Sequence, residues 1–284
     1  MTTQQTATSN TNTTLVLGGT GKTGRRIATR LTELGVPVRI GSRSNTPPFV
    51  WEDPATWPDA VRGVQAVYIS YAPDLAVPGA PEAVQAFTEL AVKSGVRRLV
   101  LLSGRNEYEA QRAEKVVQGS GVEWTIVRAS WFDQNFSEGF FADGIAAGEL
   151  ALPVGDVGEP FIDTDDIADV ATAALTDAKH AGQVYEITGP RLLTFADAVQ
   201  IIAKATGRDI RFKRVTLEEF SAMMREFQIP DSFIDFLTYL FTEVLDGRSS
   251  QVTDGVQRAL GRPARDFADY ARETAATGVW NAKA

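Results

Sequence analysis

The chain has 284 residues, no cysteine and a formal net charge of −8, from 36 acidic and 28 basic residues. The lack of cysteine excludes disulfides, thiolate catalysis and cysteine-based metal sites, and an acidic surface disfavours nucleic acid as the main partner. The only histidine, His180, lies in a polar, turn-like stretch and is expected to be exposed, which leaves no material for a Ser-His-Asp triad or a multi-histidine metal site.

Residues 1–12 are polar and rich in Thr, Gln and Asn. They lack the apolar core of a signal peptide, so we expect a disordered tail. No apolar stretch approaches the length of a membrane span. We therefore expect a cytoplasmic protein without membrane contact.

An apolar run over residues 13–17 leads into a glycine-rich turn, and an amphipathic helix follows at once. This layout places a pyrophosphate on a helix N-terminus, where backbone N–H groups lack partners and the helix dipole favours negative charge. A plain βα turn that needs glycine for a positive φ is the alternative. A P-loop is excluded, because Val16 stands where its first glycine must be. The predicted dinucleotide-binding residues here are Gly18, Gly19, Thr20, Gly21, Lys22, Thr23 and Gly24.

A second strand is predicted over residues 36–40, followed by Ser42 and Arg43. No carboxylate stands there to bind a ribose 2′-hydroxyl, whereas Arg43 suits a 2′-phosphate. We therefore expect NADP(H) in preference to NAD, although Arg43 alone would also fit an exposed loop. Asp53 follows a short predicted strand at residues 49–51. It either meets the adenine amino group or belongs to a simple turn.

Further strands alternate with helices through the first half, which predicts a Rossmann-type, doubly wound parallel sheet covered on both faces. Strands are expected at 66–70, 98–103 and 124–128, and helices at 81–94 and up to Gly119 or Gly121. In the second half we expect a capped helix at 164–171, a strand at 183–188 that returns to the sheet, a helix after Thr194, a strand at 209–215 and helices within 216–245. This division predicts an NADP-binding domain over residues 13–150 and, over 151–284, mainly a smaller α/β C-terminal substrate lobe.

The glycine turn, the Gly41–Ser44 segment, Leu101–Gly104 and above all Ser120–Phe136 resemble the NmrA-like family of atypical short-chain dehydrogenases. The segment around Val50–Trp57 is most similar to the festuclavine synthase type and its bacterial relatives. The resemblance implies NADP(H) on a Rossmann half and a substrate beneath a C-terminal lobe. By the same analogy, Ser70, Tyr71 and Ala72 should lie near the cofactor.

Short-chain dehydrogenases use Tyr-x-x-x-Lys with an upstream serine, and the lysine lowers the tyrosine pKa for proton transfer. Ser103 ends a strand at the expected place and is assigned to both the catalytic and the cofactor-binding set. Tyr108 is the tyrosine candidate, but it follows too closely, and an exposed residue at the start of a helix is the alternative. The catalytic lysine position of related reductases falls near Ala110, so the usual acid is missing or comes from elsewhere.

Aromatic residues after the strand at 124–128 predict an apolar pocket at the carboxyl edge of the sheet. Asn135 is the polar residue expected to act within it, and Asp163 could orient substrate or belong to a helix cap. For each aromatic residue, core packing is an equally good interpretation. The predicted pocket residues are Trp131, Phe132, Asn135, Phe136, Asp163, Met223, Phe227 and Tyr239.

These features predict an NADPH-dependent reductase that transfers hydride to a small aromatic or unsaturated carbonyl, imine or quinone. A non-catalytic NADP(H)-sensing regulator that binds a protein partner is the alternative, because the Tyr/Lys pair is absent. The expected partner is a small hydrophobic substrate. The sequence leaves open whether the chain is a monomer or a homodimer.

Overall fold

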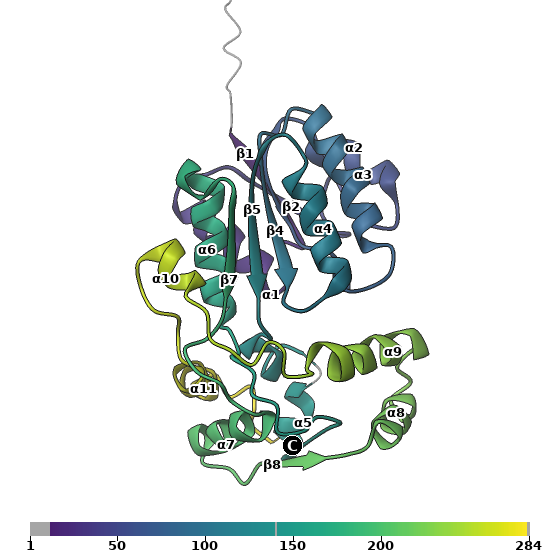
Figure 1. Cartoon of the computed structure of the whole chain (residues 1–284), viewed down its shortest axis with the longest axis vertical. Helices are drawn as coiled ribbons and strands as arrows, with labels where there is room; N and C mark the ends of the chain where they lie inside the picture. Colours follow the sequence, from purple (N-terminus) through teal and green to yellow (C-terminus); the bar gives the residue numbers. More distant parts are fainter. Residues whose placement is uncertain (1–11, 140, 283–284) are drawn as a thin grey trace, which may run out of the picture.

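The structure is a computed structural model that describes residues 12–139 and 141–282. The predicted N-terminal tail therefore lies, apart from Asn12, outside the described residues. In the described part, six parallel strands form one sheet in the order β2-β1-β3-β4-β5-β7 (Figure 1). Their bounds are β1 Thr13–Leu17, β2 Val38–Gly41, β3 Val64–Ile69, β4 Arg98–Gly104, β5 Glu123–Ala129 and β7 Gln183–Ile187.

Alternate residues of β1 pack against helices on opposite faces of the sheet. Leu15 and Leu17 lie in a core with the helices on one face, whereas Val16 lies in a core with the helices on the other. The first face carries α2 Trp57–Val61, α3 Ala80–Lys93 and α4 Tyr108–Gln118, and the second carries α1 Lys22–Glu33 and α6 Thr164–Thr176 (Figure 1). The sheet is thus buried on both sides, as its continuous apolar strands predicted.

A smaller lobe lies beyond the carboxyl ends of the strands (Figure 1). Its two strands, β6 Glu149–Leu152 and β8 Arg211–Arg214, pair in parallel. The lobe has its own apolar core, in which Phe136, Phe195 and Phe220 are fully or almost fully buried. Its helical segments are α5 Phe141–Ala147, α7 Phe195–Thr206, α8 Leu217–Glu226, α9 Asp231–Tyr239, a π-helical turn at Leu240–Val244 and α11 Phe267–Ala276; α10 Gly255–Leu260 packs beside β7.

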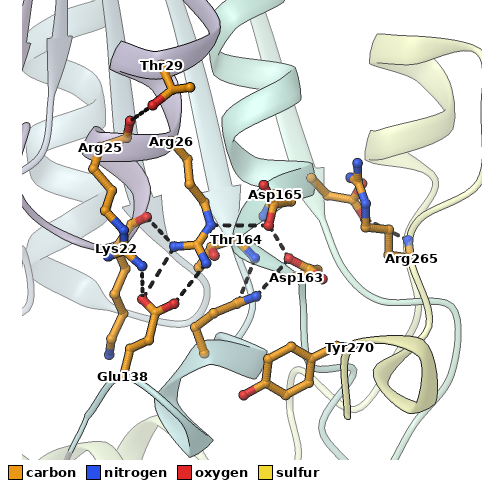
Figure 2. A network of polar contacts seen from close by, with 12 residues as sticks. Lys22, Arg25, Arg26, Thr29, Glu138, Asp163, Thr164, Asp165, Arg265 and Tyr270 are labelled. Atoms are coloured by element: carbon orange, nitrogen blue, oxygen red, sulfur yellow. Dashed lines mark hydrogen bonds and ion pairs between the residues drawn. The ribbon is translucent and has the colours of Figure 1, made fainter. Parts of the chain in front are cut away.

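A polar network joins the two parts of the molecule (Figure 2). Arg26 of α1 pairs with Glu138, with an Nη2–Oε1 distance of 2.8 Å, and with Asp165 of α6, with an Nε–Oδ2 distance of 3.1 Å. Arg30 pairs with Asp165 and Asp169, each at 2.6 Å. The helix that begins at the glycine turn is therefore fixed both to α6 and to the segment that enters the lobe.

Two expectations from the sequence are wrong. Residues 49–51 are not a strand: Phe49 and Trp51 instead pack with Trp57 and Phe87 in an aromatic cluster, which buries these side chains without sheet pairing. His180 is not exposed, because it lies under β5 and β7 and its Nδ1 is 2.8 Å from the hydroxyl of Tyr185. Within the described residues, no helix is both long and apolar enough to cross a membrane.

Asp133 is a buried carboxyl group whose two oxygens have no hydrogen-bond partner within the described part of the chain. Burial, together with the charges of Asp163, Asp166 and Asp266, raises its pKa well above the ordinary value. A carboxyl group with a raised pKa in the folded state favours folding at low pH. That contribution is lost as the pH rises from the unfolded pKa towards the folded one, at about 1.4 kcal/mol per pH unit.

We therefore expect Asp133→Asn to be more stable than the parent at pH 8 and to lose that advantage near pH 4. Urea unfolding of both proteins across this pH range measures the difference. Parallel pH dependences for the two proteins would show that Asp133 is not held protonated.

Candidate active-site cleft

A cleft of about 370 Å³ lies at the carboxyl edge of the sheet, between the sheet and the smaller lobe. The sheet side contributes the glycine turn and the residues that end β3, β4 and β5, and the lobe side contributes Glu159, Leu240, Val244 and Ser249. Of the predicted site residues, the cleft brings together Gly18, Gly21, Lys22, Thr23, Ser70, Tyr71, Ala72, Ser103, Trp131, Phe132 and Asn135.

The glycine turn brings the start of α1 onto the end of β1. Gly18 has φ +64°, and a Cβ at Gly24 would lie 2.2 Å from the carbonyl oxygen of Gly18. Only glycine allows this contact between backbones. Gly21 caps α1 without a side-chain hydrogen bond, and the first turn of the helix contains no acidic residue. The first N–H groups of α1 therefore have no capping side chain, as expected of an anion-binding helix terminus.

Lys22 crosses the cleft from the glycine turn to the lobe. Its Nζ donates a hydrogen bond of 2.7 Å to Oδ1 of Asn135, in a short 3₁₀ segment at Asp133–Phe136. Burial lowers the Lys22 pKa, an effect that Arg25 and Arg26 increase and Glu138 opposes. Asn135 thus holds the ammonium group at the edge of the glycine turn.

The predicted residues after β2 lie outside the lining of the cleft. Arg43 is exposed in the loop that follows β2, and Ser42 donates a hydrogen bond to Asn45. Asp53 is exposed, and its carboxylate accepts a hydrogen bond from the backbone N–H of Ala55, so it caps a 3₁₀ turn at Pro54–Thr56. Since β2 runs parallel to β1, Arg43 nevertheless follows a strand that ends at the same edge as the glycine turn. Gly19 and Thr20 belong to the turn without lining the cleft.

Ser103 is buried and donates a hydrogen bond of 2.6 Å to Glu114 of α4. Glu114 also accepts hydrogen bonds from Arg128 of β5, which in turn pairs with Glu186 of β7. Arg105 pairs with the same Glu186 at 2.8 Å. These linked hydrogen bonds orient the Ser103 hydroxyl toward Glu114. The Ser103 proton therefore already takes part in a hydrogen bond.

Three carboxyl groups line the cleft: Asp74, Glu107 and Glu159. Burial raises the pKa of Glu159 to about 7, although the Trp131 backbone N–H, Arg105 and Ser130 oppose the shift. Burial also raises the pKa of Asp74, and it raises that of Glu107 well above the ordinary value, with further contributions from the charges of Asp74 and Glu114. The cleft therefore contains carboxyl groups that bind protons unusually tightly.

Several residues predicted for catalysis or the pocket lie outside the cleft lining. Tyr108 begins α4 and is 69% exposed. Phe136 is fully buried in the core of the lobe, because it packs against other phenylalanines there. Asp163 caps α6 by accepting a hydrogen bond from the Asp165 N–H and another from Gln134.

The expected wall from α8 and α9 also differs. Phe227 is 74% exposed just after α8, and Met223 packs against the core of the lobe. Tyr239 is half-buried, and its phenol forms a hydrogen bond with the backbone of Tyr108. The π-helical turn that follows α9 instead supplies Leu240 and Val244 to the cleft. Helical spacing located the helices but not the face that meets the cleft.

Sequence reasoning missed Asp74, Arg105, Glu107 and Glu159. A usable signal existed for three of them. Asp74, Arg105 and Glu107 each stand within five residues of the end of a parallel strand, at the edge where ligands bind in such sheets. Glu159 lies far along the chain from its neighbours in the cleft, and no local pattern indicates its place.

Comparisons with known proteins agree with this arrangement. The model of the NmrA-like family matches residues 109–262. Prestalk A differentiation protein A of Dictyostelium discoideum is 31% identical over 92% of this chain and 91% of its own length. The chain belongs to the NmrA-like family. The resemblance expected from the sequence is thereby confirmed.

Two further comparisons give the context. The NAD(P)H azoreductase of Xenophilus azovorans is 31% identical over 92% of this chain and 98% of its own. Among solved structures, an NADPH-dependent quinone oxidoreductase of Escherichia coli complexed with NADPH has a TM-score of 0.76. It is 19% identical, and the match covers 92% of this chain and 99% of that one. This second likeness concerns the fold, and it confirms the predicted Rossmann-type architecture.

The contact between Gly24 and Gly18 gives a direct test. In Gly24→Ala the added methyl group would overlap backbone atoms, so either the turn or α1 must shift, and we expect a loss of about 1–3 kcal/mol in unfolding free energy. In the control, Gly155→Ala, the nearest atoms are the flexible end of Arg214. Equal stability of the two variants in urea unfolding would contradict the close contact.

Proposed function

We propose that the protein is an NADPH-dependent reductase of small aromatic or unsaturated acceptors. One observation carries the proposal: a single cleft joins an uncapped helix N-terminus at a glycine turn to an apolar wall. Trp131, Leu240 and Val244 belong to that wall. The first feature suits a dinucleotide phosphate, and the second suits a flat organic acceptor.

The residues present fit a nicotinamide dinucleotide. Glycine at 24 lets the start of α1 approach the backbone of Gly18, the first turn of α1 has no capping side chain, and Lys22 adds a cation beside its N–H groups. Arg43, on the loop after β2, would meet a 2′-phosphate, and Ser42 would lie beside it. When bound, the reduced nicotinamide supplies a hydride.

The chain's own residues then position the acceptor and exclude water. Trp131 stacks on Phe241, with ring centroids 5.7 Å apart, and so presents a fixed aromatic surface. Tyr71, which lines the same cleft, packs on Trp51. Asn135 is held by Lys22 and would orient a polar atom of the acceptor. Such positioning and exclusion of water account for much of the barrier reduction in hydride transfer.

The relatives support this function. The azoreductase and the quinone oxidoreductase are, by name, reductases that use NAD(P)H and NADPH respectively. The azo group and the quinone that these names give are unsaturated acceptors, which suit the apolar wall of this cleft. The differentiation protein is not named as an enzyme, which favours the alternative of a cofactor-sensing regulator. An assay of NADPH oxidation distinguishes the two functions.

We expect NADPH oxidation, followed at 340 nm, when the protein is mixed with a panel of quinones, imines and dyes. We expect Asn135→Ala to lower kcat/KM by at least about tenfold, because the polar contact and the anchor of Lys22 are both lost. Tyr108→Phe is the matched comparison and should have no effect, since Tyr108 is exposed. Binding of NADPH without turnover of any acceptor would favour the sensing regulator.

Arg43 provides a test of cofactor preference. Arg43→Ala should weaken NADPH binding by about 1.5–3 kcal/mol, the usual contribution of a charged hydrogen bond, and leave NADH binding unchanged. Isothermal titration with both cofactors measures this. A parallel loss for both, or for neither, would show that Arg43 does not read the 2′-phosphate.

A further inference from the structure

Glu107 is the most isolated carboxyl group of the cleft. It directly precedes α4 and is only 9% exposed. Its carboxyl group lies against Gly104, where an added Cβ would be 2.2 Å from the carboxyl carbon and both oxygens. Glycine at 104 therefore makes room for Glu107 at the end of β4, beside Ser103.

No hydrogen bond or ion pair is found for the Glu107 side chain among the described residues. The cations of the cleft are bound elsewhere. Arg105 pairs with Glu186 and bonds to Ser130 and to the backbone of Ser249, and Lys22 is bound to Asn135. A nearly buried carboxylate without a cation or donor is costly, so a carboxyl group in this position keeps its proton.

The groups that face Glu107 favour the same state. Asp74, from the loop after β3, and Glu114, from α4, contribute negative charge, and Tyr239 approaches from α9. Asp74 lines the same cleft, and the only described hydrogen bond of its side chain is from the backbone N–H of Ala76. Because the charge of Asp74 raises the pKa of Glu107, the two carboxyl groups titrate as an interacting pair.

The other hydroxyl groups that could donate a proton are poorly suited. Ser103 already donates to Glu114, and Tyr108 is exposed outside the cleft. Tyr71 lines the cleft, but burial raises the pKa of its phenol, which makes it a weaker acid. Glu159 differs from Glu107 in that the Trp131 backbone N–H, Arg105 and Ser130 all favour its carboxylate form. Glu107 is the acid that these contacts leave available.

We propose that Glu107, paired with Asp74, delivers the proton that completes reduction of the acceptor. The inference rests on the proposed reductase function. The acceptor carbon or ring gains a hydride, with its two electrons, from the reduced nicotinamide, and the acceptor oxygen or nitrogen gains the proton of Glu107. Glu107 is left as a carboxylate, and solvent returns its proton through Asp74, which is the more exposed of the two.

The first test compares two acceptors. Reduction of a 1,4-naphthoquinone consumes a hydride and a proton, whereas reduction of a triarylmethane cation consumes only a hydride. We expect Glu107→Gln to lower kcat for the quinone by about 100-fold or more, with a much smaller loss for the dye. Glu109→Gln is the control, because Glu109 is two residues away and pairs with Arg112. Equal losses for both acceptors would overturn proton delivery, and a raised KM confined to the dye would show a cation-binding carboxylate instead.

The pH dependence adds a second readout. Quinone reduction by the parent protein should decline as the pH rises and the pair loses its proton. Asp74→Asn removes a negative neighbour, so the pKa of Glu107 should fall and the decline should move to lower pH. Glu107→Gln should abolish this decline. A decline that stays in place in both variants would overturn the assignment.

Infrared spectroscopy of the protein alone separates this inference from the proposed function. Because Asp133 and Glu159 also contribute, the spectra are compared as differences: at pH 7 one protonated carboxyl band of the parent should be missing in Glu107→Gln and retained in Glu109→Gln. If the band behaves this way but neither acceptor is reduced, the reductase function fails and the proton-holding pair stands. If the band is the same in Glu107→Gln as in the parent, the pair is refuted whatever the activity.

Discussion

The ion pairs between the arginines of α1 and the carboxylates around them fix the cleft. Arg26 binds both Glu138 and Asp165, and each of these carboxylates binds a second arginine. Since α1 begins at the glycine turn and Glu138 follows Asn135 closely, the network sets the distance between the glycine turn and the entry to the lobe (Figure 2). A single surface ion pair contributes little, but partly buried groups that share partners are costly to separate.

The two ends of the cleft differ in electrostatic character. At the glycine turn the helix terminus and Lys22 favour anions, whereas Asp74, Glu107 and Glu159 lie further along the carboxyl edge. The arginine that also lines this part, Arg105, is neutralised by Glu186. A phosphate-rich ligand is therefore attracted to one end only. The other end presents buried carboxyl groups with raised pKa values beside the apolar wall.

The sequence predicted the elements whose cause is local. Glycine spacing and apolar alternation located β1, α1 and the parallel strands, because each pattern reflects burial of its own segment. The strand expected at residues 49–51 failed because its aromatic side chains pack in a cluster that includes Phe87 of α3. For a related reason, Phe227 was wrongly predicted to line the pocket and Glu107 was not predicted at all. Whether a helix side chain faces the cleft, or a carboxyl group lacks a cation, depends on residues far along the chain.

Under the proposed function, the same electrostatic division accounts for the lack of a Tyr-x-x-x-Lys pair. A phenol becomes a useful acid near neutral pH only when a neighbouring cation lowers its pKa, and the cations beside Ser103 are committed to Glu114 and Glu186. A carboxyl group has the opposite requirement, because burial and negative neighbours raise its pKa towards neutrality. Surroundings that keep the pKa of a tyrosine too high for proton transfer thus raise the pKa of a glutamic acid into a useful range. The charges around Gly104 select the kind of acid that this cleft can use.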